Sequence, residues 1–242
     1  MAEKSYFAYE VEPQDVDFTL RAKAPSLIMA ALNAAGRDAH NKGFGVDNLE
    51  SQNRTWVLAR VAIEVDRRPL QYAPYRVETW INGYTRVLST RNFRLLDADG
   101  EPFMKIVSQW AMLDIERRTS VDLSFFSQAH DRFIVDAPSP IDPPGRLQAP
   151  SAEAATTEHQ VVYSDIDFNR HVNTNRYIEM IFDRLPIAAL ADDRPFRLDM
   201  HFLHESTLGE TLRIACEERP EGVWCEIATA EYPCVRASVR WR

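Results

Sequence analysis

The chain has 242 residues and a formal net charge of −8, and 45% of its residues are hydrophobic. A chain of this length and composition is expected to form one large domain or two small ones and is not expected to be disordered. The acidic balance argues against nucleic acid or an anionic membrane as a partner bound through the net charge.

The N-terminus and the cysteines indicate a cytoplasmic protein. Residues 1–12 contain several acids and no apolar signal-peptide region. No apolar run approaches the ~20 residues of a membrane span. Cys216, Cys225 and Cys234 are odd in number and evenly spaced, which fits neither a disulfide framework nor a zinc site. We therefore expect reduced cysteines, no cofactor, no metal and no membrane association.

A helix followed by an antiparallel meander is predicted for the first half. An apolar stripe predicts a helix that begins near Pro25 and ends at Gly43, a residue suited to a helix C-terminus. The turn residues Asp97 to Gly100 separate two of the expected strands. β-Branched and aromatic residues with partial alternation predict strands at 56–65, 75–81, 87–96 and 103–113.

A proline-rich linker at 136–155 is predicted to separate two domains, 1–135 and 156–242. The run from Asp136 to Pro150 holds five of the 14 prolines, and proline cannot donate hydrogen bonds within secondary structure. The second half repeats the order of the first, with a lead-in strand and a helix from about Asn173. Its later strands are predicted at 196–203, 211–217, 223–231 and 234–241.

Polar residues gather just before the second helix. If the segment is extended, the side chains of Asp167, Asn169 and His171 share one face, because side chains along a strand repeat every second residue. The helix that follows would place them at its N-terminus, where free N–H groups and the helix dipole stabilise negative charge. This pattern indicates a site for attack on a carbonyl group.

The same plan occurs 150 residues earlier. Asp15-Val-Asp-Phe18 matches Asp165-Ile-Asp-Phe168, and the two apolar helix stripes match at the same displacement. The positions equivalent to Asn169 and His171 are Thr19 and Arg21 in the first copy. Each half is therefore expected to be an α+β unit whose helix covers an antiparallel sheet, and the second copy alone keeps the reactive side chains.

These residues resemble a known family. Segment 165–178 is similar to the Asp-x-Asp-x-Asn-x-His-Val-Asn-Asn-x-x-Tyr-Ile signature of plant and bacterial acyl-ACP thioesterases. The first half also resembles these enzymes, through the segments 56–58, 79–83 and 108–112. The resemblance covers roughly residues 5–242. It implies a tandem hotdog fold, in which each half wraps an antiparallel sheet around a long helix. It also implies hydrolysis of fatty acyl thioesters on acyl carrier protein, which releases free fatty acid and ends chain elongation.

Carried over to this sequence, the resemblance implies catalytic roles for Asp167, Asn169, His171 and Glu205. Glu205 is interpreted as the general base that activates water, or as a nucleophile that forms an acyl anhydride. The plant enzymes carry a cysteine at the position of Ser206, so a cysteine nucleophile is not expected here.

Substrate contacts are expected from both halves. Backbone N–H groups near Val172 and Asn173 are the predicted donors to the developing oxyanion. The family pattern implies that the first half supplies much of the acyl pocket, although ordinary core packing explains its apolar residues as well. The candidates there are Met29, Leu32, Trp56 and Trp110.

Several alternatives stay open at this point. The substrate could instead be an acyl-CoA, the reaction could be that of a hotdog dehydratase, or the protein could be a non-catalytic acyl-binding module. Eight arginines between Arg54 and Arg94, followed by Arg117 and Arg118, form a basic region that suits either an acidic carrier protein or a solvated strand surface. A homodimer is compatible with this plan.

Overall fold

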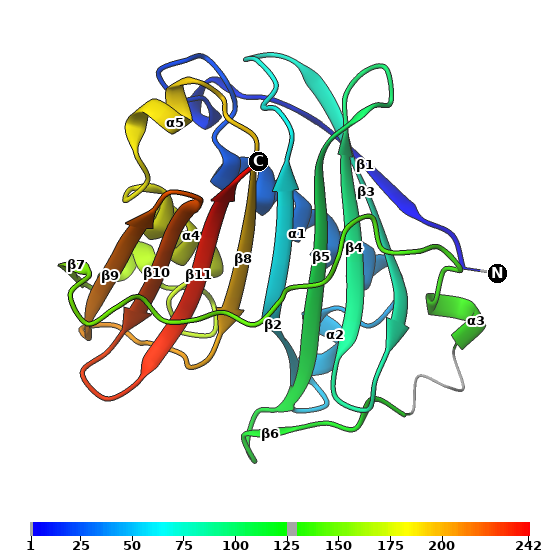
Figure 1. The fold of residues 1–242 in the computed structure, drawn as a ribbon. Helices are drawn as coiled ribbons and strands as arrows, with labels where there is room; N and C mark the ends of the chain where they lie inside the picture. The colour runs from blue at the N-terminus through cyan, green and yellow to red at the C-terminus, as the bar shows by residue number, and fades with distance from the viewer. Residues whose placement is uncertain (1, 125–129) are drawn as a thin grey trace. The chain divides into compact units, whose positions relative to one another are not determined.

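The computed structural model describes residues 2–124 and 130–242, and the chain divides into two compact units, Met1–Pro143 and Pro144–Arg242. Each unit contains an antiparallel sheet with helices (Figure 1). The boundary between the units falls inside the proline-rich segment predicted as a linker. The expected division of roles between the two halves stays a prediction.

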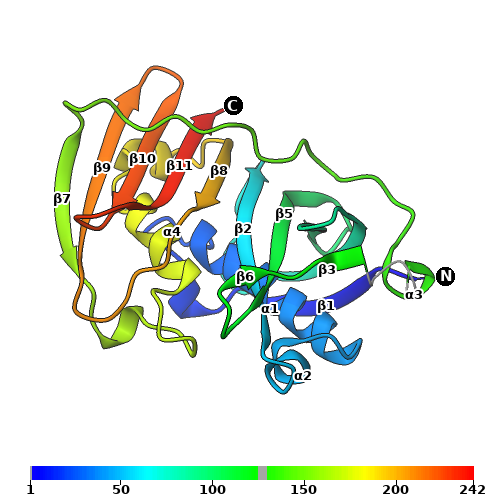
Figure 2. The ribbon, with the colours of Figure 1, turned by 90° about the horizontal axis from the view of Figure 1, so that it is seen from below.

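The first unit is built on helix α1 (Ala24–Asn41). Pro25 lies in its first turn, where the missing N–H costs nothing, and Gly43 follows it with φ of 79°. Small buried alanines allow the helix to lie close to the strands, and Figure 2 shows α1 along one face of them. The predicted helix is confirmed within two residues at its C-terminal end.

The sheet of the first unit has the strand order β1-β3-β4-β5-β2, with neighbours antiparallel. A turn at Asp97 to Gly100 joins β4 and β5 as predicted, because the Asp97 carboxylate accepts two backbone N–H groups of the turn. The short elements α2, α3 and β6 were not anticipated. The bounds are β1 Ser5–Glu10, β2 Arg54–Val65, β3 Pro74–Tyr84, β4 Ser89–Leu96, β5 Pro102–Asp114, β6 Thr119–Ser120, α2 Val46–Glu50 and α3 His130–Phe133.

The second unit repeats this arrangement with the strand order β8-β11-β10-β9-β7. Helix α4 (Thr174–Phe182) begins after the cap residue Asn173 and is shorter than the apolar stripe suggested. Its Phe182 ring packs edge-on against Phe196. The other bounds are β7 Ala155–Gln160, α5 Ile187–Ala191, β8 Phe196–Phe202, β9 Thr211–Arg219, β10 Gly222–Ala228 and β11 Pro233–Trp241.

The cysteines correct one expectation. Cys216 and Cys225 form a disulfide, so the prediction that all three cysteines are reduced was wrong. The hairpin of β9 and β10 places these two residues directly opposite each other, with Cα atoms 4.2 Å apart. Even spacing in the sequence did not reveal this register. Cys234 is free and buried.

The described residues also bear on membranes and metals. Within 2–124 and 130–242, no helix is both long and apolar enough to cross a membrane. In the same ranges no group of three or more His, Cys, Asp and Glu side chains is arranged to hold a metal ion.

Candidate active site

The polar segment before α4 is a tight turn, so the expected extended strand was wrong. Ile166 and Val172 pair as an isolated antiparallel bridge, and Arg170 adopts a left-handed conformation with φ of 66°. The Asp167 carboxylate favours this turn, because its Oδ1 accepts the backbone N–H groups of Asn169 (2.8 Å) and His171 (3.2 Å). Asp167 thus orders its neighbours through their main chain. We call residues 163–173 the Asp167 loop.

The structure brings His171 and Glu205 together, although they are far apart in sequence. The N–H of Val172 donates to the carbonyl oxygen of Ser206 at 2.9 Å. This bond brings His171, which precedes Val172, beside Glu205, which precedes Ser206. His171 Nε2 lies 3.3 Å from Glu205 Oε2. The two side chains are 25% and 31% exposed. The carboxylate and the imidazole are therefore accessible from solvent and close enough to exchange a proton.

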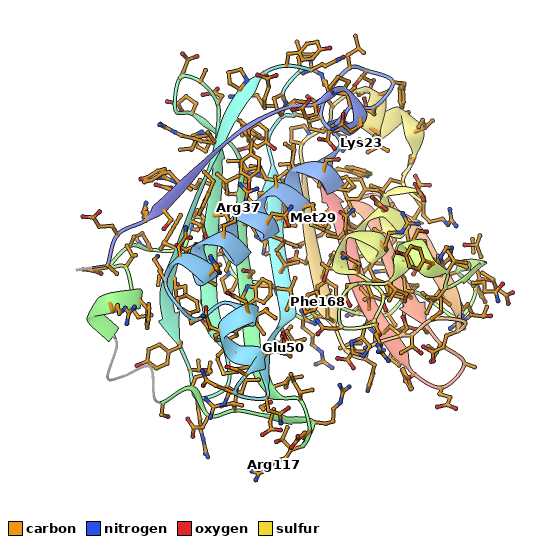
Figure 3. The ribbon with its side chains drawn as sticks, turned by 180° about the vertical axis from the view of Figure 1, so that it is seen from behind. Lys23, Met29, Arg37, Glu50, Arg117 and Phe168 are labelled. Carbon is orange, nitrogen blue, oxygen red and sulfur yellow. A yellow bond between two sulfur atoms is a disulfide. The ribbon has the colours of Figure 1, made fainter. Side chains whose placement is uncertain are left out.

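Asn169 and Phe168 project from the same loop. The backbone N–H of Asn169 is used by Asp167, whereas no hydrogen bond of its side-chain amide occurs within the described residues. Phe168 is 74% exposed (Figure 3). An amide that can donate to a carbonyl oxygen and an exposed aromatic ring thus lie two and three residues before His171.

The predicted oxyanion donors are already occupied. Val172 N–H donates to Ser206 O, and Asn173 N–H donates to Asp165 O at 2.7 Å. The side chain of Asn173 caps α4 by accepting the N–H of Asn175 at 2.8 Å. The assignment of these two N–H groups to an oxyanion was therefore wrong, because both hold the Asp167 loop in place.

Asp165 anchors the loop from its buried side. Its carboxylate accepts the Val162 N–H (2.9 Å), His159 Nε2 (2.7 Å) and Arg176 Nε (2.8 Å), and the residue is fully buried. Burial alone would raise the pKa of Asp165, but these donors together lower that pKa below its usual value. Sequence reasoning noticed Asp165 as part of the repeat and missed its role as an anchor.

The first unit holds the same backbone with different chemistry. Ala22 N–H donates to Pro69 O at 2.8 Å, as Val172 N–H donates to Ser206 O. Arg68 therefore stands where Glu205 stands, and its Nη1 lies 2.5 Å from Asp17 Oδ2.

Sequence comparison missed this equivalence. The loops are displaced by 150 residues, whereas the strand ends that carry Arg68 and Glu205 are displaced by 137. A single fixed displacement cannot align both.

The four predicted acyl-pocket residues lie within the first unit and are half-buried. Met29 and Leu32 lie on α1, as Figure 3 shows for Met29. Trp56 on β2 packs against a buried apolar cluster and donates its indole N–H to Phe44 O at 3.1 Å. Trp110 on β5 donates to the hydroxyl of Ser108 at 2.8 Å. Their contact with an acyl chain stays a prediction.

Much of the predicted basic region is paired with acids. At least five of the eight arginines between Arg54 and Arg94 pair with carboxylates, and Arg68 and Arg91 are buried. Such arginines cannot all present free charge to a partner protein. The pairs are Arg67 with Asp97, Arg68 with Asp17, Arg86 with Asp122, Arg91 with Asp38 and Arg94 with Glu78.

Solved structures share this fold. A crystal structure of an acyl-ACP thioesterase from Bacteroides thetaiotaomicron matches 99% of this chain and 98% of its own, with a TM-score of 0.90 and 34% identity. The 12:0-ACP thioesterase from Umbellularia californica matches 99% of this chain and 97% of its own, with a TM-score of 0.88 and 18% identity. The fold is thus of the hotdog class found in thioesterases.

Family models identify the family directly. The model for the acyl-ACP thioesterase N-terminal domain matches residues 3–124, and the model for the C-terminal domain matches residues 148–234. The chain therefore belongs to the acyl-ACP thioesterase family.

Plant relatives agree with this assignment. The palmitoyl-acyl carrier protein thioesterase of Gossypium hirsutum is 23% identical over 83% of this chain and 53% of its own length. The oleoyl-acyl carrier protein thioesterase 2 of Arabidopsis thaliana is 24% identical over 73% of this chain and 52% of its own length. The chain spans about half the length of these relatives.

Proposed function

We propose that this protein hydrolyses the thioester of fatty acyl chains carried on acyl carrier protein, which releases free fatty acid and ends elongation. Family membership supports the reaction class. The observation that carries the proposal is the 3.3 Å separation of His171 Nε2 and Glu205 Oε2 at an accessible loop. These are the groups that water activation requires. His171 lies just before the N-terminal end of α4, and Glu205 lies just after the C-terminal end of β8.

In the proposed reaction, Glu205 takes a proton from a water molecule while the oxygen of that water attacks the thioester carbonyl. The C–S bond then breaks, and the departing thiolate receives a proton from the His171 and Glu205 pair, so one water yields one acid and one thiol. The Asn169 amide donates to the carbonyl oxygen as negative charge develops there, in place of the occupied N–H groups of Val172 and Asn173. Direct attack by Glu205 to form an anhydride is the variant route.

The architecture proposed for this function is a tandem hotdog. Residues 1–135 form the non-catalytic copy, 136–155 the linker and 156–242 the catalytic copy. The matching main-chain hydrogen bonds of the two loops support this duplication. In this scheme the first copy contributes acyl-chain contacts through Met29, Leu32, Trp56 and Trp110. A homodimer is a further prediction of the scheme.

The test is thiol release from matched series of acyl-ACP and acyl-CoA substrates of the same acyl lengths. Faster release from the carrier-protein series supports the proposal. Equal rates on both series contradict carrier-protein specificity and leave a general acyl thioesterase. Water loss from a hydroxyacyl thioester without thiol release identifies a dehydratase, and acyl binding without any turnover identifies a binding module.

A further inference from the structure

Three buried polar side chains meet directly behind Glu205. The hydroxyl groups of Tyr177 on α4 and Ser206 lie 2.5 Å apart. The thiol of Cys234, at the start of β11, is close enough to Tyr177 and Ser206 for both to influence its pKa. Tyr177 is 4% exposed and the other two are fully buried. Burial raises the pKa of the Cys234 thiol, so this group stays protonated and is not a nucleophile.

Ser206 is held at both ends. Its carbonyl oxygen accepts the N–H of Val172, which follows His171. Its hydroxyl group bonds Tyr177, which lies one turn into the helix that follows the Asp167 loop. The loop, the helix and the peptide after Glu205 thereby form a closed ring of covalent and hydrogen bonds. This ring restricts how the Glu205 carboxylate can move relative to His171.

The first unit shows what the fold alone requires at these three places. Leu27 N–H donates to the residue four before it, as Tyr177 N–H does, and Pro69 and Ser206 are equivalent carbonyl acceptors. The carbonyl oxygen of Phe103 accepts the N–H of Asp66, the residue that follows β2, at 3.0 Å.

The same contact identifies the third pair of positions. The carbonyl oxygen of Cys234 accepts the N–H of Leu203, the residue that follows β8, at 2.8 Å, as the carbonyl oxygen of Phe103 accepts that of Asp66. The buried trio Tyr177, Ser206 and Cys234 thus replaces Leu27, Pro69 and Phe103.

The two units therefore share a backbone but fill one internal site differently. In the first unit an apolar trio fills this internal site, and the loop there still makes the same main-chain hydrogen bonds. Hydroxyl groups need a hydrogen-bond partner when they are buried, so the polar trio is not required for packing. It occurs in the unit that carries His171 and Glu205. The polar trio is therefore expected to serve the site formed by His171 and Glu205.

We propose that the hydrogen bond between Tyr177 and Ser206 sets the position of Glu205 against His171, and that these two hydroxyl-bearing residues are positioning residues of the site. The inference rests on the proposed thioesterase function. Neither hydroxyl group is exposed, so neither touches substrate. Their effect is on geometry, and misplacement of a reacting group by about 1 Å costs about 100-fold in rate.

The test compares Tyr177→Phe, Ser206→Ala, the double variant and Ser206→Cys in steady-state thiol release. We expect each of the first two to lower kcat about tenfold while KM changes less than about twofold, because the bond acts on the reacting groups and not on acyl binding. The double variant should fall no further than either single variant, since all three lose one bond. Ser206→Cys keeps a hydrogen-bond partner for Tyr177, so its kcat should be close to that of wild type and well above that of Ser206→Ala.

Tyr75→Phe is the matched control, because Tyr75 is a buried tyrosine of the first unit. It should leave kcat unchanged, because the loss of a buried tyrosine hydroxyl away from His171 and Glu205 does not alter their geometry. An active wild type with unchanged kcat in Tyr177→Phe would overturn the inference while leaving the proposed function intact. Additive losses in the double variant would also overturn it. A wild type without thiol release would overturn the proposed function and the inference together.

Discussion

Arg68 holds in the first unit the main-chain position that Glu205 holds in the second, and its guanidinium closes on Asp17 with 2.5 Å between Nη1 and Oδ2. One backbone frame thus carries a balanced ion pair in one unit. In the other it carries a pair of acidic side chains, Asp167 and Glu205, with a histidine. Under the proposed function, this contrast gives one copy held by an ion pair and one copy that carries the reactive side chains.

Glu205→Arg should recreate the ion pair of the first unit within the second. An arginine at this position can reach the carboxylate of Asp167 as Arg68 reaches Asp17. We expect the variant to be inactive but folded, and more stable than Glu205→Ala by about 0.5–1 kcal/mol, because the pair is partly exposed. Urea unfolding of the two variants measures the difference. An arginine variant less stable than the alanine variant would contradict the equivalence of the two loops.

Arg68→Ala should destabilise the first unit, because it leaves the Asp17 carboxylate half-buried without its guanidinium partner. We expect a loss of about 3 kcal/mol in the free energy of unfolding, as is typical when one partner of a buried pair is removed. Arg86→Ala is the control, since its pair with Asp122 is exposed and its loss should have little effect. Equal stability of the two variants would contradict a structural role for Arg68.

Acid should loosen the Asp167 loop through Asp165. The pKa of this carboxyl is lowered in the folded state, so its contribution to stability is fully present above about pH 4, the unfolded pKa, and is lost as pH falls through the folded pKa. Asp165→Asn should therefore melt below wild type at neutral pH, and the gap should narrow below about pH 4. Melting temperatures across pH 2–7 check this. A gap that is constant or widens in acid would contradict the assigned pKa direction.

The disulfide between Cys216 and Cys225 should stabilise the second unit. Closing a loop of this length contributes about 2–3 kcal/mol in the chain-entropy model. Reductant should lower the melting temperature of wild type and leave Cys216→Ser/Cys225→Ser unaffected. Thiol titration in denaturant should give one free thiol per chain before reduction, that of Cys234. Three free thiols in the non-reduced protein would show that the bridge is absent in solution.

Much of this structure could be predicted from the sequence because its signals are local. The stripe around Leu27 and the turn at Asp97 depend on neighbouring residues, and both predictions are confirmed. The proximity of His171 and Glu205 was expected through the family resemblance, and the structure brings the two side chains together. Their catalytic roles stay predictions.

The errors concern partners that sequence spacing does not reveal. The extended conformation expected at Asp167 ignored the ability of that carboxylate to bond its own backbone. The oxyanion donors were misassigned because the N–H of Val172 is taken by Ser206, a residue from another element. Hydrogen-bond partners distant in sequence decide which groups stay available for chemistry.

The central claim is that one site, in the second unit, performs the chemistry. Thiol release from acyl-ACP by His171→Ala and Glu205→Gln, compared with Arg21→Ala at the position equivalent to His171, tests it most directly. We predict losses of at least about 100-fold in kcat for the first two variants, with melting temperatures close to wild type, and near wild-type turnover for the third when folded. Full activity in His171→Ala or Glu205→Gln would contradict the claim.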